Sequence, residues 1–178
     1  MSTIFFFFLL SIFINIFFEV FMNDKNLEKK IKYAQNNWAN FILKISNAFN
    51  KRDDYISIAN DLLDKLYSFN HDKIMFKPTM PGIKTFRYSR EDVLSYFIGG
   101  NSTLPFDQGF AIKPWKKITF SNSSITQRDN IIFTMGLYTF QDLNNTILEV
   151  EYTFIYELDD DNQLKIILHH SSVPYKEL

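Results

Sequence analysis

The C-terminal half of the chain contains four apolar segments that are separated only by short polar turns. We expect strands at 116–125, 131–140, 147–158 and 164–172. In the third segment, Val150, Tyr152 and Phe154 alternate with Glu151 and Thr153, which is the pattern of a strand with one buried face. Turns this short connect neighbouring strands as hairpins. The sequence therefore predicts an antiparallel sheet.

Helical periodicity dominates the residues before this sheet. Apolar residues recur at three- and four-residue steps in 26–50 and again in 55–69, which predicts two amphipathic helices. A short strand is expected at 73–79. A third helix should begin after Ser89, a good N-cap residue followed by acidic side chains, and should end at Gly99.

This order of elements predicts an α+β domain in which a curved antiparallel sheet wraps over three helices and encloses a pocket. We expect residues 26–178 to form this one domain. A chain of 178 residues with 46% hydrophobic content can bury one core but is short for two. The order resembles the cone-shaped fold named after nuclear transport factor 2, which includes SnoaL-like cyclases, ketosteroid isomerase and a kinase association domain. Such a fold does not by itself fix a function.

Residues 1–22 form a hydrophobic leader. Its apolar run approaches the ~20 residues of a membrane span, although Ser11, Asn15 and Glu19 interrupt it. No basic residue precedes the run and no small-residue cleavage site follows it. Three interpretations stay open: a cleaved targeting signal, ranked first, an uncleaved anchor, or a mature protein that starts at Met22. A signal implies secretion or an organelle, such as a plastid or the periplasm, and otherwise we expect a cytoplasmic protein.

Charge and cysteine content exclude several kinds of partner and chemistry. The chain has 19 basic and 20 acidic residues, a net charge of −1, whereas nucleic-acid binding requires a basic excess. We therefore expect no nucleic-acid partner, and a membrane partner only through an uncleaved leader. Because there is no cysteine, disulfides, thiolate nucleophiles and cysteine metal ligands are excluded.

The last predicted strand, 164–172, ends in two histidines and two serines. Strict alternation places His170 and Ser172 on the strand's apolar face, and His169 and Ser171 on the other. We expect the apolar face to line the pocket, so that His170 and Ser172 become its polar end. A buried histidine or serine is more often a hydrogen-bonded core group than a catalyst, and composition alone favours that reading. Adjacent histidines diverge on a strand and do not predict a metal site.

Six motifs follow one another along the chain: FKPT at 76–79, LSYFIGGN at 94–101, DQGFAIKPW at 107–115, MGLYTF at 135–140, VEYTF at 150–154 and HHSSVPY at 169–175. Together they resemble the iota-class carbonic anhydrases of algae and bacteria, over essentially everything from 28 to 175. The resemblance implies the cone-shaped fold and reversible hydration of carbon dioxide to bicarbonate, a lyase reaction.

The resemblance also implies a set of site residues. In this family a threonine after Lys-Pro, a tyrosine of the Ser-Tyr-Phe segment and a serine of the His-His-Ser-Ser segment hydrogen-bond bicarbonate. The candidate catalytic residues are accordingly Thr79, Tyr96, His170 and Ser172. Ser172 is preferred by the alternation argument, and His170 would serve as the base. His169 and Ser171 are further candidate substrate contacts, and the choice between Ser171 and Ser172 stays open.

The same resemblance implies that no cofactor is required, because members of the family are described as working without a metal. Other members appear with manganese, which leaves manganese or zinc open. Metal-free chemistry would need an apolar pocket for carbon dioxide, a base that takes a proton from water, and hydroxyl donors aimed at the developing negative oxygen.

Two other functions compete with this interpretation. A non-catalytic binding or oligomerisation module would use the outer face of the sheet, where we expect Thr134, Tyr138, Phe140 and Ile155. A SnoaL-like hydrolase or isomerase would need a buried carboxylate as base, and none stands out on the pocket side of the strands. The apolar outer face also predicts a homodimer, whichever function is correct.

Overall fold

The structure is a computed structural model that describes residues 3–69, 73–80 and 82–175. The chain divides into two compact units, Met1–Ala34 and Gln35–Leu178. The first unit is the N-terminal part of a long helix, and the side chains of the predicted leader lie outside the described residues. Among the described residues, no helix combines the length and apolar character needed to cross a membrane.

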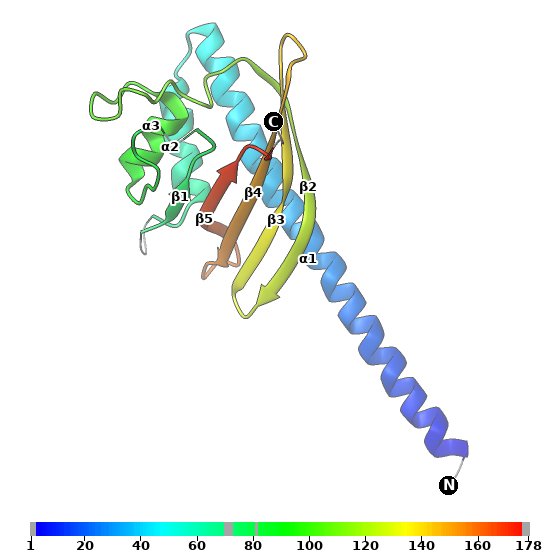
Figure 1. Cartoon of the computed structure of the whole chain (residues 1–178). Helices are drawn as coiled ribbons and strands as arrows, with labels where there is room; N and C mark the ends of the chain where they lie inside the picture. The colour runs from blue at the N-terminus through cyan, green and yellow to red at the C-terminus, as the bar shows by residue number, and fades with distance from the viewer. Residues whose placement is uncertain (1–2, 70–72, 81, 176–178) are drawn as a thin grey trace. The chain divides into compact units, whose positions relative to one another are not determined.

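The second unit has the α+β architecture that the sequence predicts. The elements in chain order are α1 (Thr3–Lys51), α2 (Tyr55–Leu66), β1 (Met75–Lys77), α3 (Arg90–Ile98), β2 (Trp115–Arg128), β3 (Ile131–Asp142), β4 (Ile147–Leu158) and β5 (Leu164–Ser172), as Figure 1 shows. The strands β4 and β5 match the predicted strands at both ends. Helix α1 begins well before the predicted helix at 26–50.

Local side-chain chemistry fixes where the shorter helices begin and end. Asp54 accepts a hydrogen bond from the backbone of Ser57 at the start of α2, and Ser89 accepts one from the backbone of Asp92 at the start of α3. These caps satisfy backbone N–H groups that have no partner inside the helix. Helix α3 ends at Gly99, which has a φ of 70°, a conformation that glycine adopts without steric cost. The predicted cap and stop of this helix are confirmed.

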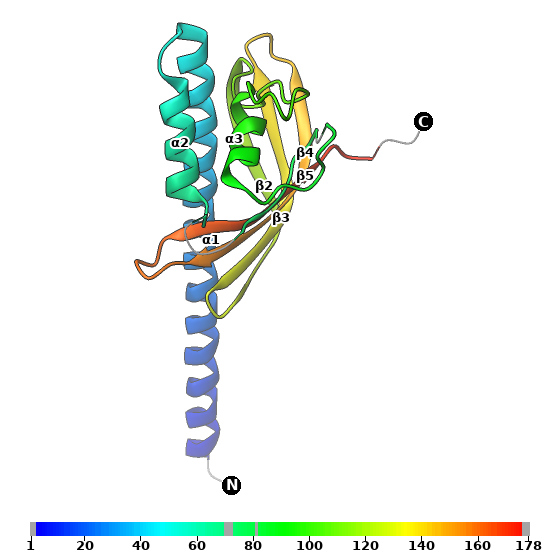
Figure 2. The same ribbon diagram turned by 90° about the vertical axis from the view of Figure 1, so that its left-hand side faces the viewer.

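The five strands form one sheet in the order β1-β5-β4-β3-β2. The strands β2 to β5 pair antiparallel with their sequence neighbours, and β1 adds a short parallel edge against β5. Figure 2 shows this sheet curving around α3, with α2 beyond it. The pairing of β1 with β5 brings the early segment that contains β1 next to the last strand of the chain.

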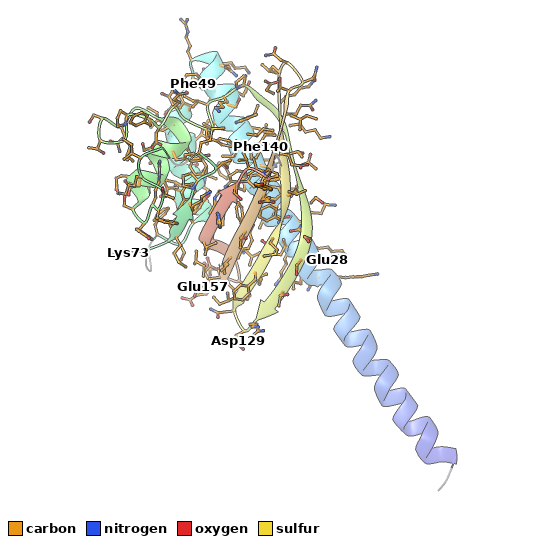
Figure 3. All side chains as sticks on the ribbon, viewed as in Figure 1. Glu28, Phe49, Lys73, Asp129, Phe140 and Glu157 are labelled. Atoms are coloured by element: carbon orange, nitrogen blue, oxygen red, sulfur yellow. The ribbon has the colours of Figure 1, made fainter. Side chains whose placement is uncertain are left out.

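The core between the helices and the sheet is unusually aromatic. The Trp38 ring of α1 meets Phe97 of α3, Phe140 of β3 and Phe154 of β4 with ring centroids 5.9–6.3 Å apart. All three contacts are edge-on, and such aromatic pairs contribute about 0.5–1.5 kcal/mol each beyond the burial of their area. Figure 3 shows Phe140 amid the densely packed side chains of this core. These rings form a rigid support for polar groups placed among them.

The predicted composition of the outer face is wrong for three residues. Thr134, Tyr138 and Phe140 are buried. Thr134 lies opposite Phe154, and Tyr138 lies opposite Val150. Directly opposite residues in an antiparallel pair share a face, so these β3 residues join the buried face of β4.

The outer face of β3 carries different apolar residues. Phe133 is 39% exposed and Met135 is 51% exposed. Both alternate with the buried residues of β3. Ile155 of β4 lies directly opposite Phe133 and is partly buried. The outer face therefore has an apolar patch, and Phe133, Met135 and Ile155 are its members.

Candidate active site

Strand β5 changes face in its middle. Ile155 pairs with Leu168 but Tyr156 pairs with Ile166, so the residue between Ile166 and Leu168 has no partner on β4. This is a β-bulge, in which one extra residue shifts the alternation by one position. Ile166 is buried before the bulge, and His169 and Ser171 are buried after it, with only 2% and 1% exposure. The bulge thus turns His169 and Ser171 into the core.

The prediction that His170 and Ser172 face the pocket between the sheet and the helices is therefore wrong. His170 is exposed, and the Ser172 hydroxyl donates to Glu151 at 3.2 Å in an exposed position. Both residues line a cavity of about 390 Å³, together with Met135 and other outer-face residues. This cavity lies across the sheet from His169 and Ser171.

Five buried side chains form a continuous hydrogen-bond network on the concave side of the sheet. The Trp38 indole Nε1 donates to Tyr67 Oη at 3.0 Å, and Tyr67 Oη lies 2.8 Å from His169 Nδ1. On the other side of the imidazole, Nε2 lies 3.0 Å from Ser171 Oγ. Ser171 Oγ in turn lies 2.5 Å from Tyr138 Oη. The network extends from α1 through the end of α2 and β5 to β3.

Every titratable member of this network is held neutral by burial. Burial lowers the pKa of His169 well below its usual value, and the neighbouring His170 adds to that shift. Burial raises the pKa of Tyr67 well above its usual value, and it also raises the pKa of Tyr138. Neutral imidazole and hydroxyl groups can donate and accept hydrogen bonds without the cost of a buried charge.

Thr79 and Tyr96 come together beside this network. Both side chains are buried, and among the described residues the Tyr96 hydroxyl has no hydrogen-bond partner. Burial raises the pKa of Tyr96, and the nearby Thr79 partly offsets this shift. Thr79 also acts on the pKa of Tyr138, after the larger effect of Ser171. Thr79 is close enough to Tyr96 to affect its titration, but the two do not meet with hydrogen-bond geometry.

The structure thus brings four hydroxyl groups together on the concave face: those of Thr79, Tyr96, Tyr138 and Ser171. Two of them, Thr79 and Tyr96, are predicted site residues, and Ser171 is a predicted substrate contact. The sequence interpretation missed Tyr138, although it lies in one of the six motifs, because alternation without the strand register placed it outside.

Aromatic rings surround this hydroxyl cluster. The ring centroid of Phe76 lies 4.7 Å from that of His169, and the ring of Phe154 lies 4.2 Å from it. Phe110 stacks on Tyr96 with a centroid distance of 5.5 Å. A cavity of about 300 Å³ lined by Met80, Phe106, Lys113 and their neighbours opens beside Tyr96 and Phe110. The site therefore combines apolar walls with a few hydroxyl groups.

A buried ion pair fixes the segment that carries Thr79 relative to the helix that carries Tyr96. Arg87 donates to both carboxylate oxygens of Asp107, at 2.6 and 2.7 Å. The backbone of Arg87 exchanges two hydrogen bonds with Phe76 of β1, and its side chain donates to the Asp92 carbonyl of α3. Its guanidinium also lies 5.6 Å from the centre of the Tyr96 ring. Arg87 thereby links β1, α3 and Asp107.

The side chains of the site do not fit a manganese or zinc ion. The described residues contain no group of three or more His, Asp or Glu side chains that could hold one. At the site itself, both nitrogens of His169 already have protein hydrogen-bond partners. Hydroxyl groups alone are poor ligands for zinc, which prefers imidazole, thiolate and carboxylate.

Comparison with known proteins places this arrangement in a family. The profile of the metal-independent carbonic anhydrase family matches residues 29–173. A metal-independent carbonic anhydrase from Nostoc is 31% identical over 159 residues, which cover 88% of this chain and 78% of the relative. The crystal structure of a cyanobacterial iota-carbonic anhydrase with bicarbonate is similar with a TM-score of 0.82 and 31% identity, covering 84% of this chain and 93% of that one.

A more distant structure shares the fold alone. A nuclear transport factor 2-like protein from Salmonella enterica aligns with a TM-score of 0.53 at 13% identity, over 87% of this chain and 96% of that protein. This supports the cone-shaped fold that the order of elements predicts. The profile match, the Nostoc relative and the bicarbonate-bound cyanobacterial structure are more specific, and they show that the chain belongs to the metal-independent, iota-class carbonic anhydrases.

Proposed function

We propose that this chain catalyses the reversible hydration of carbon dioxide to bicarbonate at the hydroxyl cluster of Thr79, Tyr96, Tyr138 and Ser171. The observation that carries the proposal is the buried Tyr96 hydroxyl, which has no hydrogen-bond partner in the part of the chain that the structure describes. Leaving a buried hydroxyl unpaired costs about 1–3 kcal/mol. An oxygen of the substrate would accept the hydrogen bond that Tyr96 can donate, so the unpaired hydroxyl marks a position where substrate binds.

The chemistry of the cluster suits this reaction. Water adds its oxygen to the carbon of carbon dioxide and releases one proton to solvent, while the two original oxygens gain negative charge. Hydroxyl donors aimed at these oxygens stabilise the charge as it develops, and they do so more strongly where water is excluded. The rings that contact Tyr96, such as Phe76 and Phe110, give the site the apolar surroundings that suit an uncharged gas molecule. The exposed His170 is not part of this cluster, and His169 supports Ser171 instead.

The purified protein is expected to hydrate carbon dioxide faster than buffer alone, with a rate that neither a chelator nor added manganese or zinc changes. The site residues, which lack a suitable set of metal ligands, support this metal independence. A pH-indicator assay under the three conditions measures it. Hydration only with added metal would contradict metal independence, and no hydration under any condition would reject the activity and favour a non-catalytic module.

We also propose a homodimer that forms through the apolar patch of Phe133, Met135 and Ile155. The exposure of Phe133 and Met135 on the outer face supports it. Analytical ultracentrifugation at micromolar concentration is expected to show a dimer, and Met135→Glu is expected to dissociate it. The matched control is Ile83→Glu, which replaces an exposed apolar residue outside the sheet. A monomeric wild type would contradict this proposal.

The role of the leader is a separate proposal. We propose that residues 1–22 direct the protein to a secretory or organellar compartment, such as a plastid or the periplasm. The apolar character of this sequence supports the proposal. Mass spectrometry of the native N-terminus tests it, because a mature protein that begins at Met22 would contradict it.

A further inference from the structure

The hydrogen-bond network behind Ser171 begins at a group that can only donate. The Trp38 indole has an N–H but no lone pair that accepts, and its partner is Tyr67 Oη at 3.0 Å. Tyr67 Oη has one hydrogen of its own, and its second partner is His169 Nδ1 at 2.8 Å. Tyr67 therefore donates its hydrogen to Nδ1.

This direction determines the tautomer of His169. Burial lowers the pKa of His169 well below its usual value, so the imidazole is neutral and carries one hydrogen. Because Nδ1 accepts from Tyr67, that hydrogen lies on Nε2 and is donated to Ser171 Oγ at 3.0 Å. In the other tautomer the imidazole hydrogen lies on Nδ1, which would donate it to Tyr67 Oη. The buried Tyr67 hydrogen would then have no acceptor.

The same direction decides what the network offers to a ligand. Ser171 Oγ accepts from His169, and one more hydrogen bond joins it to Tyr138 Oη. If Tyr138 donates to Ser171, the Ser171 hydrogen stays free, and if Ser171 donates, the Tyr138 hydrogen stays free. In both cases one hydroxyl hydrogen remains free to be donated to a ligand at the hydroxyl cluster. With the reversed tautomer, Ser171 would donate to Nε2 and Tyr138 to Ser171, which leaves only lone pairs.

We infer that Trp38 and Tyr67 are positioning residues that hold His169 in its Nε2–H tautomer and so make the network present a hydroxyl hydrogen, and not a lone pair, to the bicarbonate anion. This inference rests on the proposed function, because it assumes that bicarbonate binds at the hydroxyl cluster. A donor stabilises an anionic oxygen, whereas a lone pair repels it. Neither residue touches the substrate, and both act through His169.

Nitrogen NMR of the wild-type protein tests the tautomer directly. In a long-range ¹H–¹⁵N correlation spectrum, His169 is expected to show a protonated Nε2 and an unprotonated Nδ1 at neutral pH. The chain has three histidines, so the signals that disappear in His169→Gln assign the residue. A protonated Nδ1 in the wild type would overturn the inference, even if the enzyme is active.

Tyr67→Phe tests the consequence for catalysis. The variant removes the donor to Nδ1, so the Nδ1–H tautomer should appear in the spectrum. The value of kcat/KM should fall by about 10–10²-fold, because a misdirected oxyanion donor forfeits part of what such a donor contributes. An unchanged tautomer or unchanged activity in this variant would overturn the inference.

Tyr156→Phe is the matched control. The Tyr156 hydroxyl is also buried but has no hydrogen-bond partner among the described residues, so its removal alters no network. This control should keep the wild-type tautomer and activity. If both variants lost activity and thermal stability equally, Tyr67 would have only a packing role. If the wild type had no activity, the proposed function would fail, and the NMR result would still decide the tautomer.

Discussion

Ser171→Ala is expected to lower kcat/KM for carbon dioxide hydration by about 10²–10³-fold, the usual cost of losing one oxyanion donor. The change removes the hydroxyl that joins His169 to Tyr138 and belongs to the hydroxyl cluster. A stopped-flow pH-indicator assay, in both the hydration and the dehydration direction, measures the loss.

Ser172→Ala is the matched control for this variant. It removes the same atom from the next residue, whose hydroxyl contacts Glu151 on the opposite face of the sheet. It should leave the activity close to that of the wild type. Thermal melting of both variants separates loss of fold from loss of chemistry. If Ser172→Ala lost activity and Ser171→Ala kept it, the face assignment given by the bulge would be contradicted.

The order and ends of several elements could be predicted because their causes are local. Strand β4 alternates along its whole length, and Asp159 closes the following turn by accepting hydrogen bonds from the backbones of Asp161 and Gln163. Ser89 and Gly99 mark the ends of α3 in the same local way. Such signals depend on residues a few positions apart, so one sequence contains them in full.

The face of the last strand could not be predicted, because one extra residue reverses it. The alternation argument is correct up to Ile166, and it fails from Leu168 onward. Nothing in the Lys-Ile-Ile-Leu stretch distinguishes a bulge from a regular strand, since all four residues are compatible with either. Alternation predicts that His170 and Ser172 face the core, whereas the structure buries His169 and Ser171 there.

The supporting residues of the site were missed for a different reason. Tyr67 and His169 are 102 positions apart, and Trp38 and Tyr67 are 29 apart. Their contact depends on how α1, the end of α2 and β5 pack together. A tyrosine at the end of a helix and a tryptophan in an amphipathic stripe both resemble ordinary core residues. Only the assembled fold shows that they form one network.

Asp107→Asn is expected to lower the free energy of unfolding by about 3–5 kcal/mol, the typical cost of breaking a buried ion pair. The Arg87 and Asp107 side chains are 1% and 4% exposed, and their two hydrogen bonds are parallel. The amide is uncharged and can accept only on one oxygen, so the buried guanidinium loses the negative charge that Asp107 places beside it. The Ser95 hydroxyl, which donates to the same carboxylate, also loses a charged acceptor. Urea denaturation, with extrapolation to water, measures the change.

Asp61→Asn provides the comparison for an exposed pair. Asp61 and Lys65 lie as close together, at 2.6 Å, but their side chains are 51% and 60% exposed. Water screens such pairs, so this variant should cost no more than about 1 kcal/mol. Because Arg87 also lies over the Tyr96 ring and connects β1 to α3, Asp107→Asn should reduce activity at temperatures where the protein is still folded. Equal stability losses in the two variants would mean that burial does not determine how much the Arg87–Asp107 pair contributes to the free energy of unfolding. The alignment of Thr79 with Tyr96 would then depend on other contacts.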